Sequence, residues 1–136
     1  MAEHVVHKSV SFQAAPEVLF HTLVSERAMT EWMTAEVELE AKAGGSVEVA
    51  IEGWPLLTGE VEVYDTPSAL RVRWQSEGWP GPLTTVITID REGDGSRLML
   101  HETGYGDDDE LCRTRDYLWS HWLARLAAVS APIHNR

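Results

Sequence analysis

The chain has little cysteine, few basic residues and no long apolar run. With a single cysteine, Cys112, in 136 residues, it cannot form an internal disulfide. No apolar stretch approaches the roughly 20 residues that a membrane-spanning helix needs. The segment from Met1 to Lys8 is too polar for the apolar region of a signal peptide. We therefore expect a soluble, cytoplasmic protein that makes no membrane contact.

Basic residues are outnumbered two to one by acidic ones. The 11 Lys and Arg stand against 22 Asp and Glu, which gives a formal net charge of −11. Such a charge repels the phosphates of nucleic acids and of lipid headgroups, so neither is an expected partner. The length of 136 residues predicts one domain, 1–136, and the 43% hydrophobic composition suffices for its core.

Several catalytic and metal-binding motifs are also missing. The sequence contains no Gly-x-Ser-x-Gly elbow, phosphate-binding loop, Rossmann fingerprint or His-Glu-x-x-His. Its histidines show no ligand spacing: His4 and His7 are an odd number of residues apart on one strand, and His21, His101 and His121 fall on separate elements. We expect no metal and no cofactor.

The chain does contain apolar residues that alternate with charged ones. After a loose alternation over 3–12, Pro16 opens a short helix to Val24, and a second short helix runs to Met33. Six further alternating segments follow, the last with Leu98 and Leu100, and turns such as Gly44-Gly45 separate them. This pattern predicts an antiparallel meander and excludes alternating βαβ units.

A long amphipathic helix is predicted from Asp107 to about Val129. Its apolar stripe consists of Leu111, Leu118, Trp119, Trp122, Leu126 and Val129. One sheet with a single apolar face and one such helix must bury these surfaces against each other. The fold class is therefore a two-layer α+β domain.

Scattered residues over nearly the whole chain carry a family resemblance. They include Phe12, Ala15-Pro16, Trp32, Gly44-Gly45, Gly59-Glu60-Val61, Leu70 to Trp74, Gly95 to Leu100, Gly104-Tyr105, Trp122 and Leu126. With them the chain resembles the START-like, birch-pollen-allergen-like SRPBCC superfamily. Within it, the chain is most similar to the family named after the activator of a heat-shock chaperone's ATPase. The resemblance implies a helix-grip fold: a seven-stranded antiparallel sheet wraps around the C-terminal helix, two short helices lie between strands one and two, and a cavity remains inside.

Strand parity selects one candidate catalytic residue, Glu102. Successive side chains on a strand alternate between faces, so Glu102 points inward with Leu98 and Leu100, as Trp74 does on an earlier strand. A carboxyl among apolar side chains has a raised pKa, which suits proton transfer or the anchoring of a cationic ligand. The alternative is that Glu102 lies in water at the end of its strand.

Aromatic residues gather at one end of the predicted meander, because every second connection lies at the same end. The sequences Gly53-Trp54-Pro55, Gly78-Trp79-Pro80 and Gly104-Tyr105-Gly106 share that end, with Trp32-Met33 beside them. Two Gly-Trp-Pro loops predict the mouth of a cavity. Two alternatives remain: the indoles cap the core, or they lie in the interface of a homodimer.

The leading hypothesis is the binding of a small hydrophobic molecule between the C-terminal helix and the sheet. The expected ligand contacts are Trp32, Trp54, Trp74, Trp79, Ile87, Leu100, Glu102, Tyr105, Leu118, Trp119 and Trp122, although Trp122 also fits a purely structural role. The resemblance implies two alternatives, an enzyme similar to polyketide cyclases and aromatases, and a co-chaperone that stimulates a chaperone ATPase. We do not expect a chaperone partner, because the chain has no accessory domain.

Overall fold

Two short helices separate the first strand from six others, and a long helix follows the last strand. The structure is a computed structural model that describes residues 4–132. Its elements are β1 (Val6–Phe12), α1 (Pro16–Val24), α2 (Glu26–Met33), β2 (Glu36–Leu39), β3 (Ser46–Ala50), β4 (Leu57–Asp65), β5 (Ala69–Gln75), β6 (Leu83–Glu92), β7 (Gly95–Thr103) and α3 (Asp109–Ser130).

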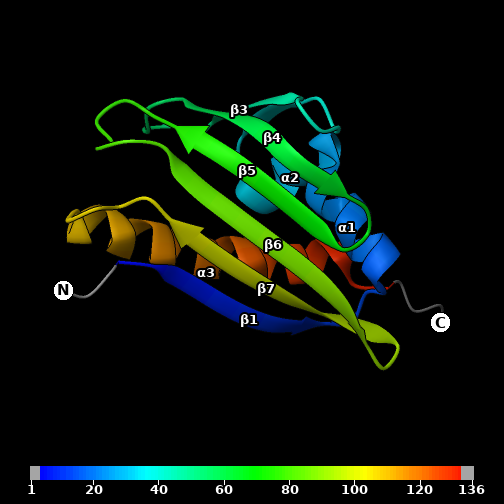
Figure 1. Cartoon of the computed structure of the whole chain (residues 1–136). Helices are drawn as coiled ribbons and strands as arrows, with labels where there is room; N and C mark the ends of the chain where they lie inside the picture. Colours follow the sequence, from blue (N-terminus) through cyan, green and yellow to red (C-terminus); the bar gives the residue numbers. More distant parts are fainter. Residues whose placement is uncertain (1–3, 133–136) are drawn as a thin grey trace.

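All seven strands form one antiparallel sheet in the order β1-β7-β6-β5-β4-β3-β2 (Figure 1). Strands β2 to β7 form a meander, because each pairs with the next one along the chain. Strand β1 joins the sheet at its other edge, beside β7. The predicted meander and the predicted α+β helix-grip fold are both confirmed.

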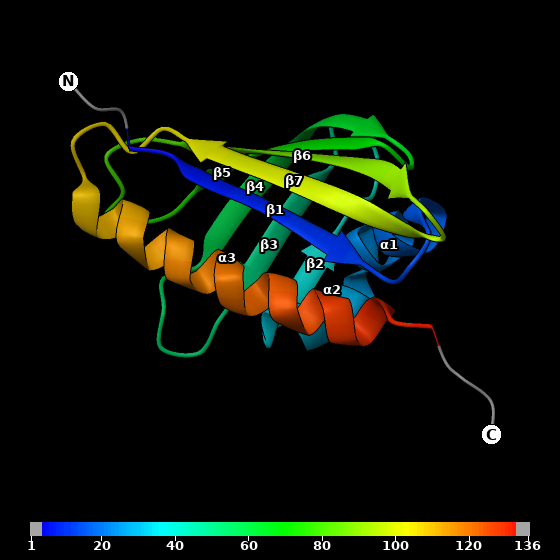
Figure 2. The same ribbon diagram turned by 90° about the horizontal axis from the view of Figure 1, so that it is seen from below.

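The helices cover one face of the sheet. In Figure 2, α3 runs across this face, and α1 and α2 lie near its C-terminal end. The alternation along the strands decides which face is covered: on β5, Leu70, Val72 and Trp74 are buried, whereas Arg71 and Arg73 between them are exposed. Burial of a large apolar side chain contributes about 1.5–3 kcal/mol, so this face and the helices stabilise each other.

The helices begin where the sequence supplies a suitable first residue. Pro16 is the first residue of α1, where its missing N–H costs nothing. The Ser25 hydroxyl accepts a 3.3 Å hydrogen bond from the Ala28 N–H at the start of α2. The Asp108 carboxylate accepts a 2.9 Å bond from the Leu111 N–H, so α3 begins at Asp109, slightly later than predicted. Across residues 4–132, no helix is long and apolar enough to cross a membrane.

Candidate functional site

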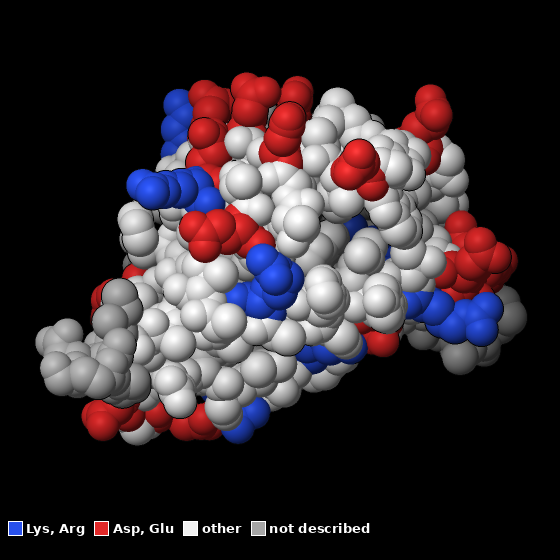
Figure 3. All heavy atoms as spheres, turned by 180° about the vertical axis from the view of Figure 1, so that it is seen from behind, with Lys and Arg blue, Asp and Glu red and all other residues white. Residues whose placement is uncertain are grey.

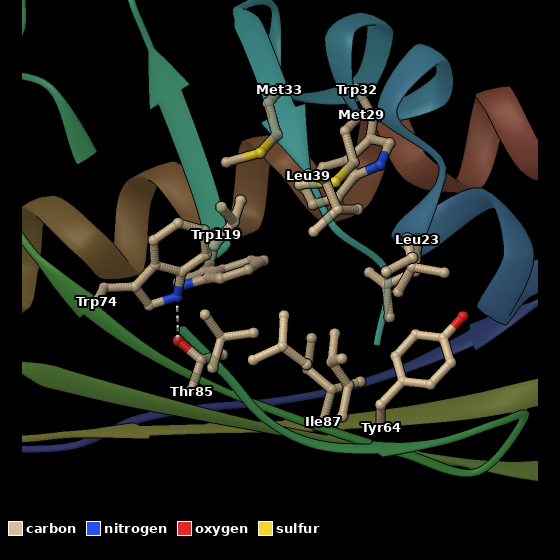
Figure 4. A pocket seen from close by; sticks show the side chains of 16 residues that line it. Leu23, Met29, Trp32, Met33, Leu39, Tyr64, Trp74, Thr85, Ile87 and Trp119 are labelled. Carbon is tan, nitrogen blue, oxygen red and sulfur yellow. Dashed lines mark hydrogen bonds between the residues drawn. The ribbon is translucent and has the colours of Figure 1, made fainter. Parts of the chain in front are cut away.

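An apolar cavity of about 40 Å³ lies between α1, α2, the sheet and one residue of α3 (Figure 4). We call this space the inner cavity. Its lining consists of Leu23, Val24, Met29, Trp32, Met33, Leu39, Ala41, Val47, Val61, Tyr64, Leu70, Val72, Trp74, Thr85, Ile87 and Trp119. Helix α3 contributes only Trp119, so the cavity lies mainly beneath α2 and not along α3 as predicted.

The inner cavity reaches the surface beside β2 and the turn that follows it. Most of its lining is buried, but Leu39 and Tyr64 are half-buried and Ala41 is exposed. The prediction that the mouth lies between Trp54 and Trp79 is wrong for this cavity, because neither residue lines it.

A buried carboxylate, that of Glu102, lies at the centre of a polar cluster. Arg115 donates from Nε to Oε1 and from Nη2 to Oε2, both at 2.9 Å. The Tyr105 hydroxyl donates to Oε1 at 2.5 Å, and Trp119 Nε1 donates to Oε2 at 3.0 Å. The Thr85 hydroxyl also donates to Oε2. These five residues, which we call the Glu102 network, use both oxygens of the carboxylate.

Backbone geometry explains how the network assembles. Thr85 on β6 is the direct cross-strand partner of Glu102 on β7. Arg115 lies four residues after Leu111 and four before Trp119, so it occupies the apolar stripe of α3 that faces the sheet. Arg115 and Thr85 were not among the predicted site residues. The charged residue inside an apolar stripe was the available signal, because a buried arginine almost always has an acidic partner.

The Glu102 network keeps its carboxylate ionised. Burial alone would raise the pKa of Glu102, but the charge and hydrogen bonds of Arg115, with those of Thr85 and Tyr105, outweigh it and hold that pKa below its ordinary value. Burial and the negative charge of Glu102 raise the pKa of Tyr105 far above its usual range. The expected rise in the pKa of Glu102 is therefore wrong, and so is the alternative of a carboxyl in water, because Glu102 is 0% exposed. A catalytic role for Glu102 stays a prediction.

The lowered pKa of Glu102 predicts how stability depends on pH. The ionised Glu102 carboxylate contributes fully to the free energy of unfolding above the ordinary pKa of 4.5. This contribution is lost as the pH falls through the lower pKa of the folded state. Below pH 4.5 we expect the free energy of unfolding to fall more steeply in the unsubstituted protein than in Glu102→Gln. Urea unfolding at a series of pH values measures both slopes, and equal slopes would contradict the assignment.

A second space of about 180 Å³ lies at the end of the molecule where α3 begins. We call it the rim hollow, and its lining consists of Ile51, Trp54, Pro55, Leu57, Ser76, Glu77, Gly78, Trp79, Leu111, Thr114, Arg115 and Leu118. Both Gly-Trp-Pro loops contribute, so the prediction that Trp54 and Trp79 meet at the start of α3 is confirmed. Figure 3 shows this side of the molecule, with blue atoms at the bottom of a recess that uncharged residues border.

The Glu102 network separates the two spaces, which share no lining residue. Thr85 and Trp119 line the inner cavity, whereas Arg115 lines the rim hollow. All three donate hydrogen bonds to Glu102, so its carboxylate lies between the two spaces. Trp74 extends the boundary, because its Nε1 donates to the Thr85 hydroxyl at 3.1 Å.

The residues predicted to contact a ligand fall into three groups. Four of them line the inner cavity: Trp32, Trp74, Ile87 and Trp119. Three line the rim hollow: Trp54, Trp79 and Leu118. The other four line neither space: Leu100, Glu102, Tyr105 and Trp122. Trp122 packs edge-on against Trp119 with ring centroids 5.0 Å apart. Tyr105 belongs to the third connection predicted at the same end as Trp54 and Trp79, and its side chain is fully buried in the Glu102 network. Contact of any of these residues with a ligand stays a prediction.

A seven-stranded antiparallel sheet that wraps around one long helix defines the class of protein, a helix-grip α+β domain. The chain belongs to the family described as "Activator of Hsp90 ATPase homolog 1-like protein", whose model matches residues 13–131. The resemblance to this family within the SRPBCC superfamily is thereby confirmed. A comparison with curated proteins gave no match.

Solved structures share the fold at low sequence identity. CalU16 from Micromonospora echinospora has a TM-score of 0.78 at 19% identity, over 94% of this chain and 76% of that one. An HSP90 activator from Plasmodium falciparum, PFC0360w, has a TM-score of 0.78 at 16% identity, over 93% and 95%. The Aha1 dimer from Colwellia psychrerythraea has a TM-score of 0.80 at 12% identity, over 93% and 94%. These likenesses establish the fold, and the last is to a protein solved as a dimer.

Proposed function

We propose that this protein binds a small, largely apolar molecule in the inner cavity. The single observation that carries the proposal is a cavity in which nearly every side chain is apolar, among them Met29, Trp32 and Trp119. Thr85 and Tyr64 supply its hydroxyl groups, and the Thr85 hydroxyl already bonds Glu102. Pockets with apolar walls and few polar groups are typical of small-molecule sites.

The size of the inner cavity limits what enters it without rearrangement. Its volume of about 40 Å³ is well below the roughly 150 Å³ of a cavity that holds benzene. A longer ligand requires Met29 and Met33 on α2 to move, and unbranched methionine side chains adapt readily to new shapes. A linear aliphatic chain therefore suits the cavity better than a bulky ring.

Binding is favoured over catalysis by the absence of an acid or base in the cavity. Among the described residues that line it, Tyr64 is the only one with a titratable side chain. Glu102 does not line the cavity, and its carboxylate is occupied by Arg115. An enzyme similar to polyketide cyclases would have to act here by orienting its substrate alone.

Stimulation of a chaperone ATPase is the remaining alternative. The family description and the name of the Plasmodium falciparum structure refer to such activators. We expect this chain to leave the ATPase rate of an Hsp90-type chaperone unchanged in a mixed assay. A clear stimulation would replace ligand binding as the proposed function.

Substitution at the opening tests the proposal. We expect 1-octanol to change the indole NMR signals of Trp32, Trp74 and Trp119 saturably, because these rings line the inner cavity. Ala41→Phe should weaken this binding about tenfold, since the added ring stands at the exposed opening. Ala41 is exposed, so the substitution should leave folding intact.

Ala43→Phe is the matched control. Ala43 is exposed in the same turn but does not line the inner cavity. The Ala43→Phe variant should bind 1-octanol as the unsubstituted protein does. No saturable change in the unsubstituted protein, or an equal loss in both variants, would refute the proposal.

A further inference from the structure

The rim hollow is larger than the inner cavity and is closed off from it. Its volume is about 180 Å³, against about 40 Å³ for the inner cavity. The Glu102 network lies between them, so a molecule in one space does not occupy the other. The rim hollow therefore needs its own explanation, independent of the proposed function.

Two tryptophans are partly exposed at the rim hollow. Trp54 is 50% exposed, and Trp79 is half-buried. Among the described residues, neither indole stacks on another aromatic ring. With Leu111 and Leu118 they make a mainly apolar, aromatic wall. Large unpacked apolar surfaces around a concave space are typical of binding sites.

The floor of the rim hollow carries one buried donor, Arg115. The residue is 2% exposed, and its guanidinium carbon lies 5.4 Å from the ring centroid of Trp79. Its Nε and Nη2 bond Glu102, but Nη1 makes no hydrogen bond within the described part of the chain. Within the described residues the one fully buried side-chain polar atom without a partner is the Ser130 hydroxyl, so Nη1 keeps contact with solvent, and an acceptor in the hollow that Arg115 lines can accept its hydrogen bond.

The surrounding charges disfavour an anionic ligand. The charge of Arg115 is already balanced by Glu102 at 2.9 Å. Glu77, an exposed acidic residue, also lines the hollow. A neutral oxygen accepts a hydrogen bond from Nη1 without bringing a second negative charge toward these groups.

We propose that the rim hollow is a second ligand site, which takes a neutral aromatic molecule with a hydrogen-bond acceptor oxygen. The ring lies against Trp54 and Trp79, and the oxygen accepts from Arg115 Nη1. Tryptophan faces contribute through their large apolar area and their preferred stacking geometry. The arginine fixes the orientation of the ligand.

Two probes that differ only in the oxygen test the site. 2-Acetylnaphthalene has a ketone, and 2-ethylnaphthalene has none. We expect both to shift the indole NMR signals of Trp54 and Trp79, and the ketone to bind about tenfold more tightly, as a hydrogen bond to a charged donor implies. Equal affinities, or shifts confined to Trp32 and Trp74, would overturn the proposal.

Variants of one loop separate this site from the inner cavity. Trp54→Ala should weaken 2-acetylnaphthalene binding about tenfold. Leu56→Ala is the control, because Leu56 is 48% exposed in the same loop but does not line the hollow. Ala41→Phe should leave this binding unchanged while it weakens that of 1-octanol. Loss of 2-acetylnaphthalene binding in Ala41→Phe, or unchanged binding in Trp54→Ala, would refute a separate site.

Discussion

Replacement of Arg115 by methionine is expected to lower the free energy of unfolding by about 3–5 kcal/mol, because it leaves a buried carboxylate without its counter-charge. Glu102 is 0% exposed, and Arg115 supplies two of its five hydrogen bonds. The neutral donors of Thr85, Tyr105 and Trp119 cannot replace the lost charge. Urea unfolding followed by tryptophan fluorescence measures the change.

A double substitution distinguishes loss of charge balance from loss of packing. In Glu102→Gln with Arg115→Met no buried charge remains, so the double variant should be more stable than Arg115→Met alone. Arg125→Met is the control on the same helix. Arg125 is exposed and donates to the Glu31 carbonyl, and its loss should cost less than about 1 kcal/mol. Equal unfolding midpoints for Arg115→Met and Arg125→Met would contradict the central role of the ion pair.

The same pair shows where sequence reasoning about the site ended. Strand parity placed Glu102 inward correctly, because alternation is a local property of β7. Its pKa depends on what it meets across the core, and that is set by the rotation of α3 against the sheet. Only the packed structure brings Arg115 to within 2.9 Å of the carboxylate and reverses the direction of the shift.

The two spaces illustrate a second limit. The order of the connections in the meander was enough to bring Trp54 and Trp79 together, because it follows from the strand sequence alone. The separation of the rim hollow from the inner cavity was not predictable. It depends on how the Trp74 and Trp119 side chains and Glu102 fill the space between the sheet and α3.

The backbone that carries Glu102 and Tyr105 depends on one glycine. Gly104 has a φ of +117°, and a Cβ there would lie 2.4 Å from the Pro82 carbonyl oxygen. Gly104→Ala should lower the free energy of unfolding by about 3 kcal/mol, since it combines a backbone cost of about 1–2 kcal/mol with overpacking of about 1–3 kcal/mol.

Because Gly104 lies between Glu102 and Tyr105, the strain of Gly104→Ala should disturb the hydrogen bond between these two residues. The indole N–H of Trp119 donates to the same carboxylate, so its NMR signal should shift. Gly106→Ala separates the two costs. Gly106 has a φ of +59° and open space around it, so only the backbone cost of about 1–2 kcal/mol applies and the Trp119 signal should stay in place. Equal destabilisation by the two alanines, with no shift of that signal in Gly104→Ala, would contradict the prediction. The turn would then accommodate the added methyl group without disturbing the Glu102 network.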